Sequence, residues 1–237
     1  LTDDTHFTTF AYVSLMENGE RDFGFNRGAD GQLSIEDINA IDLTGISIIH
    51  FGSATGFLPG PLQAAYLHLL QKAIDKNIFI SFDPNYRHLL FQHNIQTFID
   101  QSWHFLQHAN FFKVSDEEAM LLTQTNSLDA ATDQLLQRTN GVFTITLGKD
   151  GTLLGLNGKK YIIESIPIKP VDTTGAGDAF VGAVLYQLRN HTKQAILNID
   201  YAGWETVIRN GNKAGARTCE YLGAMEAFKH LTNQIFQ

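Results

Sequence analysis

Short apolar runs alternate with stretches of helical periodicity from about residue 41 to the C-terminus, and this alternation is the strongest constraint on the fold. Such a pattern is typical of a mostly parallel sheet with helices on both faces. Ligands of these sheets bind outside the carboxyl ends of the strands, so functional residues are expected just after each strand. The predicted strands are 46–51, 78–82, 110–114 and 142–146, with a hairpin at 152–156 and 161–164, and the predicted helices are 59–76, 95–108, 116–123, 128–138, 175–188, most of 204–219, and 225–236.

The first segment has a different pattern, because β-rich stretches at 7–16 and 21–26 flank an Asn-Gly pair at 18–19. Asn-Gly between two such stretches is a strong β-hairpin signal. Aromatic and threonine side chains fall on both faces of these strands, so the hairpin is expected to lie over another surface. The chain therefore divides into a β-hairpin segment, residues 1–30, and an α/β domain, residues 31–237.

Charge and composition exclude several classes of partner. The chain has 237 residues, with 25 acidic and 17 basic side chains and a net charge of −8. Because nucleic acids and anionic membranes need clustered positive charge, neither is an expected partner. No window approaches the roughly 20 apolar residues of a membrane span. Cys219 is the single cysteine, which excludes an internal disulfide.

The most informative motif is Asp-Thr-Thr-Gly-Ala-Gly-Asp-Ala-Phe at residues 172–180, where two glycines open an apolar helix. Free N–H groups at a helix start form an anion site, yet Asp178 places a carboxylate in it. The conflict disappears if the anion is a phosphoryl group in transfer and Asp178 is the general base. The N–H groups of Gly175, Ala176 and Gly177 would then stabilise charge on the phosphoryl oxygens.

Two other glycine motifs do not fit these residues, whereas a purely structural interpretation does. A dinucleotide-binding fingerprint needs glycine where Phe180 stands, and a Walker A loop fails because Gly148-Lys149 is followed by Asp150. The structural alternative is a capped helix, with Asp172 or Thr174 as the N-cap and glycines that allow close packing.

The string at 172–180 resembles the C-terminal signature of the ribokinase-like carbohydrate kinases of the pfkB type, and the resemblance extends over nearly the whole chain. Residues 82–87 resemble the Asp-Pro-Asn-x-Arg segment of fructokinases and of 2-keto-3-deoxygluconate kinases. Residues 113–118 resemble the Asn-x-x-Glu motif, with Ser115 in place of asparagine. Residues 146–151 and 211–216 resemble the nucleotide-binding segments, and the hairpin followed by Arg27 resembles the fructokinase lid.

This resemblance implies a ribokinase-like three-layer α/β/α fold with a mostly parallel sheet and a small β lid. It implies an ATP-dependent sugar kinase that transfers the γ-phosphoryl group of ATP to a sugar hydroxyl, most closely a fructokinase. A 2-keto-3-deoxygluconate kinase and a catalytically inactive nucleotide-binding fragment are the alternatives. The implied cofactors are ATP and Mg²⁺, with K⁺ as a further candidate. The implied location is the cytoplasm, where ATP is available.

The resemblance also carries roles to individual residues. Glu118 would act on Mg²⁺ through water, and Asp172 and Thr174 match the start of a monovalent-cation loop. The substrate or phosphate contacts would be Arg87, Asn85 and Arg27. The ATP-binding set would be Lys113, Ser115, Thr146, Gly148, Gly151 and Asn212.

Several of these residues have an equally simple structural interpretation. Ser115-x-x-Glu118 is also a capping box at a helix start. Lys113 either assists phosphates or ends a strand, and Asp83 and Asn85 are either contacts or turn formers. Residues 220–225 keep the Gly-Ala of the cation loop but lack its proline, which leaves the cation open.

Ribokinase-like chains usually begin with a strand and a Gly-Gly segment followed by asparagine, and this sequence contains no such segment. The resemblance begins in the lid hairpin, so the N-terminal part of the family domain, which supplies sugar contacts, is expected to lie outside these residues. Without it the sheet would expose an unpaired edge. The lid is also expected to pair with a second copy in a homodimer.

Overall fold

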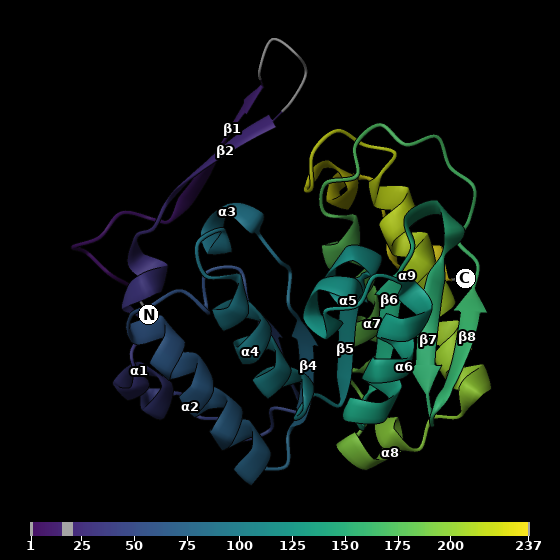
Figure 1. Cartoon of the computed structure of the whole chain (residues 1–237), viewed down its shortest axis with the longest axis horizontal. Coiled ribbons are helices and arrows are strands. Elements are labelled where there is room, and N and C mark those ends of the chain that lie inside the picture. The colour runs from purple at the N-terminus through teal and green to yellow at the C-terminus, as the bar shows by residue number, and fades with distance from the viewer. Residues whose placement is uncertain (1, 16–20, 237) are drawn as a thin grey trace.

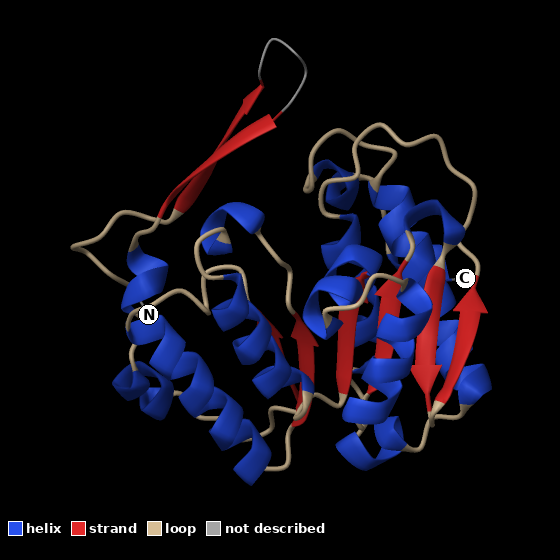
Figure 2. Ribbon diagram, viewed as in Figure 1, coloured by secondary structure: helices blue, strands red, loops and turns tan. Residues whose placement is uncertain are grey.

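A six-stranded sheet runs through the main body of the protein (Figure 2). The structure is a computed structural model that describes residues 2–15 and 21–236. The strands lie in chain order. The first four are parallel to one another, whereas each of the last two pairs antiparallel with the strand before it. The predicted mostly parallel sheet is confirmed. The strands are β3 (Ile48–Gly52), β4 (Phe79–Asp83), β5 (Phe111–Ser115), β6 (Val142–Thr146), β7 (Thr152–Leu156) and β8 (Lys159–Ile163).

Helices cover both faces of this sheet, which gives the predicted three-layer arrangement (Figure 1). One face carries α2 (Pro61–Asp75), α4 (Ile95–Leu106), α5 (Asp116–Thr123) and α6 (Leu128–Arg138), and the other carries α7 (Ala176–Leu188) and α9 (Tyr201–Thr218). Shorter elements are η1 (Ala29–Gln32), α1 (Ile35–Ala40), α3 (His88–Phe91), η2 (Gly148–Asp150), α8 (Lys193–Leu197), η3 (Glu226–Lys229) and η4 (Asn233–Phe236). No helix in the described part of the chain is long and apolar enough to cross a membrane.

The alternation of side chains along β4 and β5 separates two apolar cores. Phe82 and Phe112 belong to the core on the α2–α6 face, whereas Phe79 and Phe111 belong to the core beneath α7 and α9. Because successive strand residues point to opposite faces, Asp83 and Lys113 lie on the same face as Phe79 and Phe111. Polar side chains thus replace aromatic ones toward the carboxyl ends, on the side covered by α7.

The predicted N-terminal hairpin is present as a separate two-stranded sheet. Strand β1 (Phe10–Leu15) pairs antiparallel with β2 (Arg21–Asn26), and the register places Phe10 opposite Asn26. The hairpin projects away from the main body (Figure 1). The Asn-Gly pair predicted to form its turn lies outside the described residues.

The prediction of an α-helix over residues 225–236 is wrong. The chain forms only the two short 3-10 segments η3 and η4 there. Met225 and Phe228 are 69% and 59% exposed, whereas Ala227 is buried, so the apolar residues of this stretch share no packing face. Without such a face, a short helix has little to stabilise it in water. The short helices α1, α3 and α8 were not predicted, since each is too brief to show periodicity.

We expect Phe105→Ala to lower the free energy of unfolding by about 3–5 kcal/mol, because the change leaves a cavity in a close-packed core. The Phe105 ring is fully buried and contacts the rings of Phe51, Phe57 and Phe82. Urea unfolding monitored by circular dichroism measures this change. Leu67→Ala is the control, since Leu67 is 40% exposed on the neighbouring helix and its loss should cost within about 0.5 kcal/mol. Equal losses in both variants would contradict this assignment of the core.

Candidate active site

A pocket of about 240 Å³ opens where β3 and β4 end, against the first turns of α7. Its position agrees with the rule that ligands bind outside the carboxyl ends of parallel strands. Two carboxylates and one imidazole face it, among apolar side chains of α7. Its lining residues are His50, Gly52, Asp83, Asn85, Asp178, Val181, Gly182 and Leu185.

The first turn of α7 presents unused backbone donors beside this pocket. Gly175 is the N-cap, with φ +82°, and a Cβ there would lie 2.8 Å from that of Ala224, so only glycine fits. Ala176 donates its N–H to the Thr173 carbonyl at 3.3 Å. The N–H groups of Gly175, Gly177 and Asp178 have no acceptor within residues 2–15 and 21–236. The free donors therefore differ from the predicted set in one member, because Asp178 takes the place of Ala176.

Asp178 lies in this same turn and lines the pocket, as predicted. Its side chain is exposed, and its carboxylate makes no hydrogen bond or ion pair with any described residue. A carboxylate without partners beside free N–H donors can accept a proton from a group that those donors hold. The structure thus places the predicted base and most of the predicted anion donors together.

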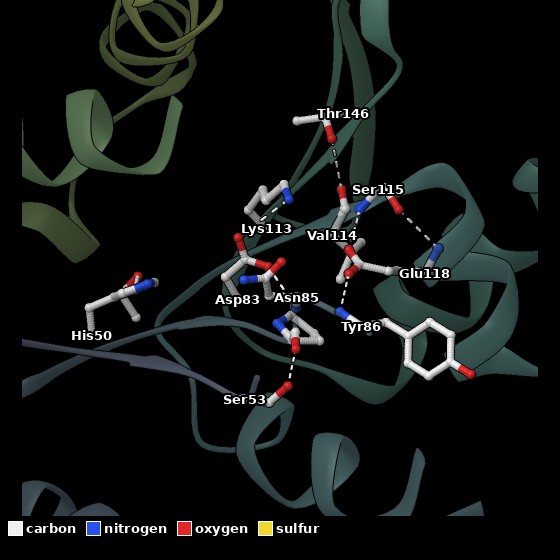
Figure 3. A network of polar contacts seen from close by, with 12 residues as sticks. His50, Ser53, Asp83, Asn85, Tyr86, Lys113, Val114, Ser115, Glu118 and Thr146 are labelled. Carbon is white, nitrogen blue, oxygen red and sulfur yellow. Dashed lines mark hydrogen bonds and ion pairs between the residues drawn. The ribbon is translucent and has the colours of Figure 1, made fainter. Parts of the chain in front are cut away.

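A buried ion pair joins β4 and β5 at the floor of the site. The Lys113 ammonium lies 3.3 Å from the Asp83 carboxylate, and both residues are less than 10% exposed (Figure 3). Asp83 also accepts the N–H of Asn85 at 3.0 Å. Burial raises the pKa of Asp83 to about 6, although Lys113 opposes that shift. A Cβ on Gly177 would lie 3.1 Å from the Lys113 nitrogen, so the ammonium lies close to the first turn of α7.

Glu118 and Ser115 form the capping box that the sequence allowed. The Ser115 hydroxyl accepts the Glu118 N–H at 3.1 Å, and the Glu118 carboxylate accepts the Ser115 N–H at 2.8 Å. The second oxygen of Glu118 accepts the N–H of Tyr86 at 2.7 Å (Figure 3). Glu118 therefore fastens the turn after β4 to the start of α5. Its action on Mg²⁺ stays a prediction, and the described residues contain no cluster of three or more candidate metal ligands.

The predicted nucleotide segment forms the end of β6 and the turn into β7. Thr146 ends β6, and its hydroxyl donates to the Val114 carbonyl at 3.4 Å. Gly151 has φ +96°, and a Cβ there would lie 2.2 Å from the Ile163 carbonyl oxygen. Gly148 also has positive φ, but the space beside it is open for at least 4 Å. Gly151 is thus needed for packing, whereas Gly148 borders free space that a ligand could enter.

Asn212 is buried in α9 and braces the β7–β8 hairpin. Its side-chain oxygen accepts the Thr152 hydroxyl at 2.6 Å, and its nitrogen donates to the carbonyls of Ile163 and Glu164. Both amide hydrogens are used within the chain. The contact of Asn212 with the nucleotide base stays a prediction. Only the second lone pair of its side-chain oxygen is left to accept a hydrogen bond from the base.

The two halves of the predicted cation loop do meet. Asp172 accepts the N–H and the hydroxyl of Thr174 with one oxygen and the Gly223 N–H with the other, at 2.9 Å. These contacts join the segment before α7 to the segment after α9. The binding of a monovalent cation there stays a prediction.

The predicted substrate residues are not all at the pocket. Asn85 lines it, in a turn where its φ is +46°. Arg87 is exposed, and its side chain contacts no described residue through a hydrogen bond or ion pair. Arg27 does not line the pocket, since its guanidinium donates to the carbonyls of Pro59 and Thr55.

His50 is a pocket residue that the sequence analysis did not single out. It lies on β3 opposite Ser81, and its Nδ1 is 3.0 Å from the Ser81 hydroxyl. Desolvation lowers the pKa of His50, and the negative charge of Asp178 opposes that shift. A polar residue inside the otherwise apolar run 48–51 was the available signal. Within the described residues, β3 pairs on one side only, so this wall of the pocket is a free sheet edge.

Comparisons with known proteins agree with this geometry. The chain is 32% identical to probable fructokinase-3 and 33% identical to probable fructokinase-4 of Arabidopsis thaliana, over 95% and 93% of its length. It spans about two thirds of these relatives, 65% and 67%. Among solved structures, fructokinase from Vibrio cholerae O395 superposes with a TM-score of 0.82 at 26% identity, covering 95% of this chain and 71% of that one.

The family model described as pfkB family carbohydrate kinase matches residues 1–231, nearly the whole sequence. The pocket at the strand ends, the glycine-opened helix and the fold of the similar proteins agree with that match. This chain belongs to the pfkB family of carbohydrate kinases.

Proposed function

We propose that this chain forms the nucleotide-binding and catalytic half of an ATP-dependent sugar kinase, with fructose as the favoured acceptor. The observation that carries the proposal is that Asp178 lines the pocket and lies in the same first turn of α7 as the free N–H donors. The relatives named fructokinase support the choice of acceptor. The Vibrio structure, described as bound to fructose, ADP and potassium ion, supports the ligand classes.

In the proposed reaction, Asp178 accepts the proton of a sugar hydroxyl as its oxygen bonds to the γ-phosphorus of ATP. The bond between that phosphorus and the bridging oxygen breaks, and ADP leaves with the electron pair. The N–H groups of Gly175 and Gly177 and the Lys113 ammonium stabilise negative charge on the transferring group. Mg²⁺, when bound, neutralises phosphate charge, and Glu118 would hold it through water.

The remaining predicted residues take supporting roles in this proposal. Nucleotide contacts come from Ser115, Thr146, Gly148, Gly151 and Asn212. Asn85, Arg87 and Arg27 contact substrate or phosphate. K⁺ is the proposed monovalent cation at Asp172 and Thr174, and the cytoplasm is the proposed location because the reaction consumes ATP.

We also propose that polypeptide beyond these 237 residues completes the sugar half of the site. The free edge of β3 supports this, because a second hollow of about 330 Å³ runs beside the same edge, between Ile46, Ile48 and Leu185. The length of the relatives supports it too, since the chain spans about two thirds of them. Residues 1–30 would serve as a lid over the bound sugar.

The lid is the proposed contact in a homodimer. Phe7, Phe10 and Tyr12 form a row of edge-to-face aromatic contacts, and all three are 43–52% exposed. An exposed two-stranded hairpin with such a row is stabilised when a second surface covers it.

We expect Asp178→Asn to lower turnover by at least about two orders of magnitude while leaving ATP affinity nearly unchanged, because only the proton acceptor is lost. Coupled ADP release measures turnover, and calorimetry measures binding. Asp100→Asn, an equal charge change on the exposed face of α4, is the control. Turnover close to that of the unchanged protein in Asp178→Asn would remove Asp178 from the role of base.

We expect fructose-dependent ADP release from a longer parent protein that includes this chain, and much slower release from the 237 residues alone, because the pocket lacks one wall. The assay uses Mg·ATP with fructose and 2-keto-3-deoxygluconate in parallel. Preference for the ketodeoxygluconate would replace the proposed substrate. Nucleotide binding without any transfer by either protein would favour the inactive nucleotide-binding fragment instead.

We expect the protein to sediment as a dimer at micromolar concentration and Phe10→Ser/Tyr12→Ser to sediment as a monomer, because the aromatic row loses its apolar area. Ile162→Ser, an equally exposed apolar position on β8, should remain dimeric. A protein that is monomeric before any substitution would exclude the lid contact.

A further inference from the structure

The Lys113 ammonium is held from one side only. An ammonium has three N–H donors. The structure records one hydrogen bond from it, to Asp83, and its side chain is 10% exposed. Two donors of a buried cation therefore have no acceptor among the residues that the structure describes. Leaving such donors unused is costly unless a ligand takes them.

The position of the ammonium indicates where that ligand would lie. The Lys113 nitrogen lies 3.1 Å from the position that a Cβ on Gly177 would take, beside the turn that carries the free N–H groups of Gly177 and Asp178. An anion bound to those N–H groups would lie beside the unused donors of Lys113. A tetrahedral phosphate with several oxygens suits this mixed set of backbone and ammonium donors.

The Asp83 carboxylate is the partner that fixes the position of the Lys113 ammonium. Asp83 is the last residue of β4 and lies on the α7 face, and its other oxygen accepts the Asn85 N–H. The backbone of the same turn is braced by Ser53, whose N–H donates to the Asp83 carbonyl at 3.3 Å and whose hydroxyl donates to the Pro84 carbonyl. The carboxylate is thus rigidly placed, whereas the lysine stem above it is long and flexible.

We propose that Asp83 is a positioning residue, whose carboxylate holds the Lys113 ammonium under the first turn of α7 with two donors ready for a phosphate oxygen. This inference rests on the proposed function, since it specifies how the same site receives the phosphoryl group. Asp83 itself does not touch the phosphate. The other charged groups around it are Glu118 on α5, Asp178 on α7 and His50 on β3.

The carboxylate also sets the charge that an incoming phosphate meets. While Asp83 is ionised, the pair is neutral overall, and Asp83→Asn would leave Lys113 with an uncompensated positive charge. If Lys113 is removed instead, the buried Asp83 has no cationic partner and takes up a proton, because burial disfavours its charged form. The effect of Asp83→Asn on anion binding should therefore exist only when Lys113 is present.

The test is a double-mutant cycle with a non-hydrolysable ATP analogue as the probe, measured by calorimetry on Asp83→Asn, Lys113→Met and the double variant. We expect Asp83→Asn to strengthen binding of the analogue by about threefold or more, and to have no effect in the Lys113→Met background. The turnover of Asp83→Asn should nevertheless fall by about tenfold or more, because the unanchored ammonium is misplaced. This split between affinity and turnover is one that a merely structural role does not produce.

Ser53→Ala is the matched control, since it loosens the same turn without changing charge, and it should not strengthen binding of the ATP analogue. Equal weakening of analogue binding by Asp83→Asn with and without Lys113 would overturn the proposal, as would the absence of analogue binding by the unchanged protein. If the double-mutant cycle gives the expected binding results but no sugar is phosphorylated, the proposed function would be contradicted and the role of Asp83 would not.

Discussion

The parallel pairing of β3, β4, β5 and β6 is the constraint on which the site depends. It brings four carboxyl ends to one edge of the sheet, and the period of two along each strand decides which side chains face α7. His50, Asp83 and Lys113 come from three different strands, yet all lie on that face. A one-residue slip in any of these strands would turn its polar residue into the opposite, aromatic core.

Single side chains hold the loops around the pocket in place. Glu118 joins the turn after β4 to α5, and Asn212 joins α9 to the β7–β8 hairpin. Asp172 joins the segment before α7 to the segment after α9. Each of these residues accepts or donates at least three hydrogen bonds. The positions that resemble ligand contacts in the motif are therefore, in part, structural braces that shape the site before a ligand arrives.

The features that could be predicted from the sequence are those that depend on residues close together in the chain. The three-layer architecture followed from the alternation of elements, and Asp178 and its helix start followed from nine contiguous residues. The Asp83–Lys113 pair was not predictable, because it depends on the register between strands 30 residues apart. The same holds for Asn212, whose partners lie 48–60 residues away, so its motif suggested a ligand where the fold needed a brace. The helix predicted for 225–236 failed because composition alone does not show whether apolar residues have a surface to cover.

The order of strands has a consequence for how the protein is made. Every strand from β3 to β8 pairs with its neighbour in the chain, so no strand must wait for a distant one. Loop closure between neighbours costs little entropy, and each new strand finds its template already formed. This part of the sheet can therefore grow in one direction as the chain leaves the ribosome, from β3 toward the β7–β8 hairpin. The turn of α7 that carries Asp178 is synthesised only after all six strands, so the anion-binding donors form over a finished floor.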